Sequence, residues 1–245
     1  SAAIAAYVAK IAIAHIHGGE RTEGVIDEGI RHSITKMSTI HFAATKEYRN
    51  RIIQMGEAPE RVYCYGAPVL DYIHQVKTLS KEQLQDVLNF NITGKIAIAT
   101  YHPVTLENGK LAKQIKEFLA AIQTVPLQVV FTKANADPDG MLINQALKRF
   151  CDSDPERYKL VDNLGQKIYY SCLKNFDLMV GNSSSGLIEA PSFRLPVVNI
   201  GDRQKNRVQA LNIINTKDDQ PSIQRGLRKA LSSSFKQRMK SVKNP

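Results

Sequence analysis

The chain has 245 residues, 43% of them hydrophobic and 10 of them proline, a composition typical of a globular protein with one large or two small domains. Its 33 basic and 23 acidic residues give a net charge of +10. Phe235 is the single aromatic residue interleaved with the basic residues after position 200, too few for base stacking, so this excess favours a diphosphate-bearing substrate over nucleic acid. No apolar run reaches membrane-spanning length, and the 3 cysteines lack metal-ligand spacing, which favours a reduced, cytoplasmic protein.

The first elements in chain order are predicted to be a helix, a strand and a second helix. Residues 1–10 form an Ala-rich helix, and the short apolar run over residues 10–14 is typical of a buried parallel strand. A loop containing Gly18 and Gly19 follows. The next helix has an apolar stripe that we expect to face the core, formed by Ile26, Ile30, Ile34 and Met37.

The loop and the second helix carry most of the titratable residues of this region. Residues 15–36 include three histidines, four carboxylates and two arginines. These groups follow a predicted strand at its carboxyl end, the edge at which open α/β sheets bind their ligands. A Gly-Gly turn lets backbone approach a ligand closely, and crowded, unlike titratable groups are typical of an active site.

Beyond residue 38, strands and helices alternate, and this alternation predicts an α/β fold with a parallel sheet. Ser80 and Gln83 have the spacing of a helix capping box. We expect the segment from 74 to 80 to connect two domains. Strands are predicted over 39–45, 62–65, 95–100, 127–132, 158–161, 178–180 and 196–200, and helices over 46–55, around 71, from 80, around 111–122, 137–150, 165–174 and 223–231.

Two later motifs also follow predicted strands. The first is Tyr101-His102-Pro103-Val104-Thr105, and the second is Gly181-Asn182-Ser183-Ser184-Ser185-Gly186, which precedes a helix containing Glu189. Backbone N–H groups at a helix N-terminus and serine hydroxyls both favour a bound anion. Arg203 and Arg207 follow the last strand and are candidates for a diphosphate or for the domain interface.

The sequence His15-Ile16-His17-Gly18-Gly19-Glu20, the segment from Asp27 to Lys36 and the two later motifs together resemble the hydrolysing UDP-N-acetylglucosamine 2-epimerases. The resemblance covers nearly the whole chain in the same order. It implies two Rossmann-like domains arranged as in glycosyltransferase-B folds. Residues 1–75 would be the C-terminal part of an incomplete first domain, and residues 76–245 the UDP-binding domain. The chain resembles a fragment trimmed at both ends, because the family's upstream Gly-Asp motif, with its catalytic aspartate, has no counterpart here.

The resemblance also implies the chemistry, which is elimination of UDP followed by hydration of the resulting glycal. The products would be UDP and N-acetylmannosamine for sialic-acid-type sugars, made by a cytoplasmic homo-oligomer (dimer or tetramer) without a cofactor or metal. The implied catalytic residues are Glu20, Asp27, Glu28 and His102. The implied substrate-binding residues are His17, Arg31, His32, Asn182, Ser183, Ser184, Ser185, Gly186, Glu189, Arg203 and Arg207, with the serines at the diphosphate and Glu189 at the ribose.

Several points stay open at this level. The residues do not decide which carboxylate acts as base and which as acid. A 2,4-diacetamido-trideoxy sugar in place of N-acetylglucosamine is an open alternative for the substrate. A non-hydrolysing epimerase, a glycosyltransferase of the same fold and a nucleotide- or nucleic-acid-binding module without catalysis are the alternatives. A glycosyltransferase would not need the carboxylates after Gly18 and Gly19, and a non-hydrolysing epimerase has a different sequence there.

Overall fold

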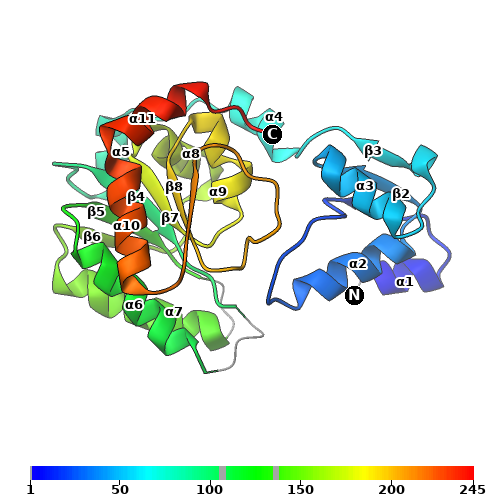
Figure 1. The fold of residues 1–245 in the computed structure, drawn as a ribbon, viewed down its shortest axis with the longest axis horizontal. Helices are drawn as coiled ribbons and strands as arrows, with labels where there is room; N and C mark the ends of the chain where they lie inside the picture. Colours follow the sequence, from blue (N-terminus) through cyan, green and yellow to red (C-terminus); the bar gives the residue numbers. More distant parts are fainter. Residues whose placement is uncertain (1, 105–108, 135–137) are drawn as a thin grey trace.

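The structure, a computed structural model, describes residues 2–104, 109–134 and 138–245. The chain forms two lobes, a smaller one built from the first 65 residues and a larger one that contains the C-terminus (Figure 1). Each lobe has its own parallel sheet. Thr105 of the predicted His-Pro motif and Asp137 of a predicted turn lie outside the described residues.

The sheet of the larger lobe has the strand order β6-β5-β4-β7-β8-β9, and all of its strands are parallel. The chain winds outward from β4 in one direction and then from β7 in the other. The switch between these two central strands is the position where doubly wound sheets form a ligand crevice at their carboxyl ends. The strands are β4 (Ile96–Thr100), β5 (Gln128–Thr132), β6 (Tyr158–Val161), β7 (Leu178–Gly181), β8 (Val197–Ile200) and β9 (Ile213–Thr216).

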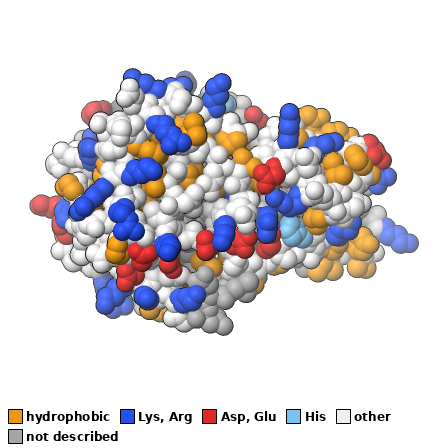
Figure 2. All heavy atoms as spheres, in the orientation of Figure 1, with side chains coloured by type: hydrophobic (Ala, Val, Ile, Leu, Met, Phe, Trp, Pro, Cys, Tyr) orange, Lys and Arg blue, Asp and Glu red, His pale blue; other side chains and the backbone are white. Residues whose placement is uncertain are grey.

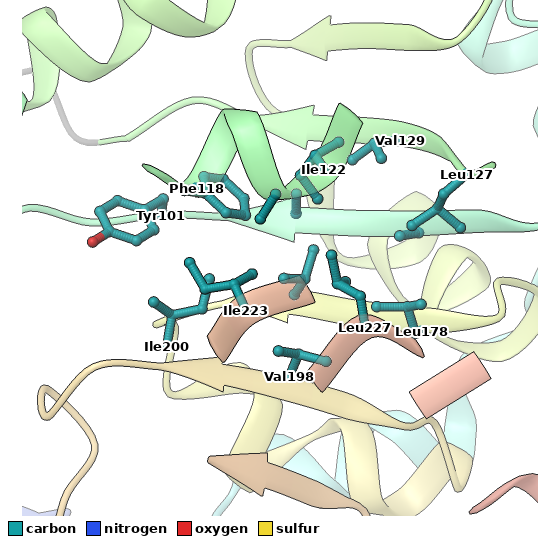
Figure 3. Packing of buried hydrophobic residues seen from close by; sticks show 14 of the residues in the cluster. Tyr101, Phe118, Ile122, Leu127, Val129, Leu178, Val198, Ile200, Ile223 and Leu227 are labelled. Carbon is teal, nitrogen blue, oxygen red and sulfur yellow. The ribbon is translucent and has the colours of Figure 1, made fainter. Parts of the chain in front are cut away.

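Helices cover both faces of this sheet, so alternate strand residues enter different cores. Ala97 and Ala99 pack with the cluster shown in Figure 3, which includes Phe118 and Leu227. Ile96 and Ile98 pack on the opposite face. The first core takes residues from α6 (Leu111–Gln123), α7 (Pro138–Ser153), α10 (Gln220–Leu231) and α11 (Ser233–Arg238); the second takes them from α4 (Val69–Gln75), α5 (Lys81–Leu88) and α8 (Gly165–Asn175).

The smaller lobe has a three-stranded parallel sheet and only a small core. Its apolar cluster contains the buried residues Ala43, Tyr48, Ile52 and Val62. Large apolar side chains remain exposed on it, including Ile4 and Tyr7 of the first helix. Figure 2 shows hydrophobic side chains on the surface of this lobe. The elements are α1 (Ala2–Val8), β1 (Ala14–Ile16), α2 (Asp27–Met37), β2 (Ile40–Ala43), α3 (Lys46–Gln54) and β3 (Val62–Cys64), in the strand order β1-β2-β3.

The strand predicted over residues 10–14 lies later in the chain, over Ala14–Ile16, and is not buried. Lys10 has φ +58° and ends α1: its N–H donates to Tyr7 O, and the N–H of Ile11 donates to Ala6 O. This is the Schellman pattern of helix termination. The prediction was wrong because the first residues of the apolar run cap the helix.

The predicted core face of α2 was also wrong. Ile26 and Ile30 are more than half exposed, and the buried residue of the helix is Thr35. Thr35 Oγ1 lies 3.2 Å from His15 Nδ1, and Arg31 reaches back to the preceding loop. These polar contacts turn the charged side of α2 toward the loop and leave Ile26 and Ile30 exposed, while Ile34 and Met37 are half-buried.

Most other predicted elements are confirmed to within a few residues, including the capping box, in which Ser80 and Gln83 bond each other's backbone N–H groups. The strand β9, the helix α11 and the three short 3₁₀ helices were not predicted. The assignment of residues 1–75 and 76–245 to two domains stays a prediction. Short helical turns complete the fold: η1 (Pro59–Arg61), α9 (Ser185–Ile188), η2 (Ala190–Phe193) and η3 (Met239–Ser241).

Candidate active site

The loop after β1 turns sharply, and this turn places His17 against Glu20. Gly19 has φ +75°, and a Cβ there would lie 2.3 Å from Tyr48 O of α3. Only glycine fits so close a backbone contact. Arg51 of α3 donates to Gly19 O and holds the turn. His17 Nδ1 then lies 2.7 Å from Glu20 Oε1.

Glu20 is buried at the junction between the lobes. Its second carboxylate oxygen accepts from Arg207, which belongs to the loop after β8 and also donates to Arg21 O at 2.7 Å. Burial raises the pKa of Glu20, but the hydrogen bond from His17 and the positive charge of Arg207 together hold the pKa below its usual value. Glu20 therefore stays ionised in a site where its side chain is 6% exposed.

A second carboxylate, Glu28, is held on the first turn of α2. Its Oε2 accepts from the Thr22 N–H at 2.6 Å and from Arg31 at 3.1 Å. Its Oε1 lies 3.1 Å from His32 Nε2. Arg31 also donates to Glu20 O and to Thr22 Oγ1. One network thus joins Glu28, Arg31 and His32 to the loop that carries Glu20.

Hydrogen bonds run from Glu20 across the junction to His102. Arg207 donates to Gln204 Oε1 at 3.0 Å, and Gln204 donates to Asn182 O at 2.8 Å. The Asn182 side chain accepts from His102 N and donates to His102 O. Asn182 and Gln204 are buried, so this path fixes the serine loop relative to both Arg207 and His102.

Asp27 differs from the other predicted catalytic residues because its side chain is exposed at the start of α2. Burial and the neighbouring charge of Arg207 lower the pKa of Arg203 below its usual value, and the negative charge of Asp27 partly opposes this shift. Arg203 donates to Asn182 O at 3.1 Å. The convergence of Glu20, Asp27, Glu28 and His102 on a single cleft stays a prediction.

The serine loop borders a cleft of about 540 Å³ at the carboxyl ends of β4 and β5. Ser185 Oγ lies 2.6 Å from Tyr169 OH, and Tyr170 OH donates to Glu189 Oε1 at 3.2 Å. Since α9 has only four residues, its dipole would contribute little to binding an anion here. The cleft is lined by Val69, Thr100, Thr132, Lys133, Asp162–Gln166, Tyr169, Tyr170, Ser183, Ser185 and Glu189.

Two glycines of this loop are required by packing. A Cβ on Gly181, which has φ +138°, would lie 1.8 Å from Thr100 O of the neighbouring strand. A Cβ on Gly186 would lie 2.8 Å from Val197 Cγ1. Gly186 is thus required where α9 packs on β8, and its predicted ligand role stays a prediction.

A second cavity, of about 900 Å³, lies between the lobes beside β8 and β9. Glu23 and Gly24 of the smaller lobe line it together with Asn199 and Arg203 of the larger lobe. Figure 2 shows acidic, basic and histidine side chains along the junction of the lobes. Within the described ranges, no group of three His, Cys, Asp or Glu side chains has a metal-binding arrangement, and no helix is long and apolar enough to span a bilayer.

Sequence reasoning missed Tyr169, Tyr170, Thr22 and Gln204. The two tyrosines lie in a helix whose pattern predicted only packing, and burial together with Glu189 raises the pKa of each. Gln204 lies between the two arginines already singled out, and this position was the only signal for it.

The chain has clear relatives. A family model described as UDP-N-acetylglucosamine 2-epimerase matches residues 1–245. The chain belongs to the UDP-N-acetylglucosamine 2-epimerase family. The GDP/UDP-N,N'-diacetylbacillosamine 2-epimerase (hydrolyzing) of Campylobacter jejuni is 40% identical over 228 residues, 93% of this chain and 59% of the relative. The UDP-N,N'-diacetylbacillosamine 2-epimerase (hydrolyzing) of Legionella pneumophila is 39% identical over 95% of this chain and 61% of the relative.

The chain thus spans about three fifths of the length of these family relatives. Solved structures agree on the fold. The Neisseria meningitidis UDP-GlcNAc 2-epimerase bound to UDP-GlcNAc matches with a TM-score of 0.83 at 19% identity. The match covers 100% of this chain and 68% of the Neisseria chain. The Methanocaldococcus jannaschii UDP-GlcNAc 2-epimerase in complex with UDP-GlcNAc and UDP matches with a TM-score of 0.78 at 19% identity. The match covers 99% of this chain and 67% of that structure's chain. The predicted glycosyltransferase-B-like α/β fold is confirmed.

Proposed function

We propose that this chain acts in a hydrolysing 2-epimerase of a UDP-linked 2-acetamido sugar. The reaction eliminates UDP across C1 and C2 of the sugar and adds water to the glycal, giving UDP and a free sugar with inverted C2. Removal of the weakly acidic C2 proton needs a well-placed base, and the departing UDP needs electrostatic stabilisation. The observation that carries this proposal is the buried, ionised Glu20, held by His17 and Arg207 where the two lobes meet.

The serine-loop cleft is the proposed UDP site. Glu189 would accept from the ribose hydroxyls, because one carboxylate can accept from both members of a vicinal diol. Ser183, Ser184 and Ser185 would bind the diphosphate, with Arg203 and His102 near it. Asn182 would fix this loop through the pair of hydrogen bonds it makes with the His102 backbone.

The loop and α2 of the smaller lobe would act on the sugar. We place the acid–base groups among Glu20, Asp27 and Glu28, with Arg31 and His32 holding Glu28 in position. His102 would contribute from the larger lobe. A glycosyltransferase would not need this set of titratable groups, and this favours an epimerase.

Two sugars are the main candidates. The two relatives near 40% identity are named for N,N'-diacetylbacillosamine, and a Neisseria meningitidis UDP-N-acetylglucosamine 2-epimerase is 29% identical. The higher identity to the two diacetylbacillosamine relatives favours UDP-N,N'-diacetylbacillosamine as substrate. UDP-N-acetylglucosamine, with N-acetylmannosamine as product, is the second candidate, and the 36% identity to the Escherichia coli polysialic acid biosynthesis protein P7 favours it.

Chromatography of the products formed by the full-length protein from each UDP-sugar tests the function. A free 2-epimerised sugar and UDP in equal amounts are expected. A UDP-linked epimer would indicate the non-hydrolysing reaction, and a sugar transferred to an added acceptor would indicate a glycosyltransferase. Unchanged UDP-sugars in every reaction would contradict the proposal.

A further inference from the structure

The two members of the His17–Glu20 pair differ in their access to solvent. The His17 side chain is 36% exposed, and that of Glu20 is 6% exposed. Both carboxylate oxygens of Glu20 are occupied, one by His17 Nδ1 and the other by Arg207. Each oxygen could accept a further hydrogen bond, but the burial of Glu20 leaves it far less accessible to a substrate than His17. His17 is therefore the member of the pair that can meet the sugar directly.

The ionised carboxylate fixes which ring nitrogen of His17 carries the proton. A carboxylate can only accept, so Nδ1 at 2.7 Å must be the donor. In the neutral ring, the lone pair then lies on Nε2. No side chain or backbone group in the described ranges is recorded as a partner of Nε2. This is the arrangement in which an acidic residue orients a histidine base.

The backbone of His17 is held in an unfavourable conformation. Its φ is +62°, in the left-handed region that residues other than glycine rarely adopt. The N–H of His17 donates to Phe42 O of β2 at 3.0 Å, which fixes the strained residue to the sheet. Strain of this kind is concentrated at functional sites, where the surrounding structure maintains it.

We propose that His17 is the base of the elimination step, with Glu20 as a positioning residue that acts through it; this inference rests on the proposed function. Nε2 of His17 takes the proton from C2 of the sugar. The electron pair of the C2–H bond forms the C1=C2 double bond of the glycal. The C1–O bond breaks, and its electron pair leaves on the β-phosphate of UDP. Glu20 stabilises the imidazolium that results.

Two substitutions at position 17 separate chemistry from structure in the full-length protein. His17→Asn keeps a side-chain N–H near the position of Nδ1 and a residue that tolerates positive φ, but it removes Nε2. We expect this variant to fold, to bind UDP like the wild type, and to lose about 10²- to 10⁴-fold in kcat. His17→Gly tolerates the backbone conformation and leaves space, so added imidazole should restore part of its activity.

Glu20→Gln should also lower kcat, and imidazole should not restore it. The double variant H17G/E20Q should be no slower than H17G, because residues that act as one unit are not additive. His74→Ala, at an exposed position of α4, is the matched control and should keep wild-type activity. In nitrogen NMR of the folded wild type, His17 should carry its proton on Nδ1, and Glu20→Gln should remove this preference.

The outcomes separate this inference from the proposed function. If the wild type leaves both UDP-sugars unchanged, the proposed function fails. If the wild type is active while H17N retains its kcat, or H17G shows no response to imidazole, the assignment to His17 is overturned. Restoration of Glu20→Ala by added formate, with H17G unresponsive to imidazole, would make Glu20 the base.

Discussion

At the scale of single residues, Glu189 gives a direct test of the proposed nucleotide cleft. It lines the cleft and accepts from Tyr170 OH at 3.2 Å. We expect Glu189→Ala to weaken UDP binding by about 1.5–3 kcal/mol, the usual value of hydrogen bonds to a charged group. Isothermal titration calorimetry with UDP measures this change.

The control for this prediction is Glu82→Ala, an acidic residue exposed on α5 and remote from the cleft. UDP affinity should not change in this variant. An unchanged affinity in Glu189→Ala would show that the ribose assignment is wrong, provided that circular dichroism shows a folded protein.

His15 makes the stability of the fold dependent on pH. Burial, followed by the charges of His41 and Arg31, lowers the pKa of His15 from 6.5 to about 4. Between these values the unfolded chain binds a proton that the folded chain rejects, so stability falls as the pH drops from 6.5 to 4. We expect His15→Gln to reduce this loss, by on the order of 2 kcal/mol.

Urea unfolding at pH 7 and at pH 4.5 measures the effect. The pKa of His41 is also lowered, mainly by burial and against the opposing charge of Glu57, so some acid sensitivity should remain in the variant. His74→Gln, at an exposed position, should retain the full wild-type pH dependence. Equal pH dependence in His15→Gln and the wild type would contradict the prediction.

At the scale of elements, the capping box of α5 tests how local signals support the larger lobe. Ser80 Oγ accepts from Gln83 N, and Gln83 Oε1 accepts from Ser80 N. The helix buries Leu84 and Leu88 in the core on one face of the sheet. We expect Ser80→Ala to lower the free energy of unfolding by about 0.5–2 kcal/mol.

A matched control is Ser33→Ala in α2, where an exposed hydroxyl donates only to Gly29 O of its own helix. Its effect should lie within about 0.5 kcal/mol. Thermal or urea unfolding of both variants compares them. Equal stability of Ser80→Ala and the wild type would show that the capping box contributes nothing to the folded state.

At the scale of the whole molecule, Arg207 connects the lobes. Its side chain is 6% exposed, pairs with Glu20 and donates to Arg21 O. Arg207→Ala removes one of the two partners of the buried Glu20 carboxylate and leaves only His17; the loss of one member of a buried ion pair typically costs about 3–5 kcal/mol. We expect a loss of this size, or separation of unfolding into two transitions, in differential scanning calorimetry.

Lys205→Ala is the control for Arg207→Ala. Lys205 belongs to the same loop, its side chain is 59% exposed, and its nearest carboxylate partner, Asp202, lies 3.8 Å away. Substitution of such a surface residue typically changes stability by less than about 0.5 kcal/mol. If the two variants unfold alike, the Glu20–Arg207 contact does not hold the lobes together.

The sequence alone determined the α/β class, the parallel sheet of the larger lobe and most of its elements. Buried strands such as Ile96–Thr100 and amphipathic helices such as Leu111–Gln123 carry this information locally, in hydrophobic periodicity and capping residues. The three motifs, in their order, were sufficient for the family. The small-lobe strand was misplaced because a Schellman cap and an apolar strand share the residues after Val8.

Only the tertiary structure decided how the titratable residues are paired. Spacing placed Ile26 and Ile30 on a core face, but contacts of Arg31 and Thr35 with distant residues turned that face outward. The Glu20–Arg207 contact joins residues 187 positions apart, which no local pattern can indicate. The pKa of Glu20 depends on this long-range pairing, because burial and the charge of Arg207 act on it in opposite directions.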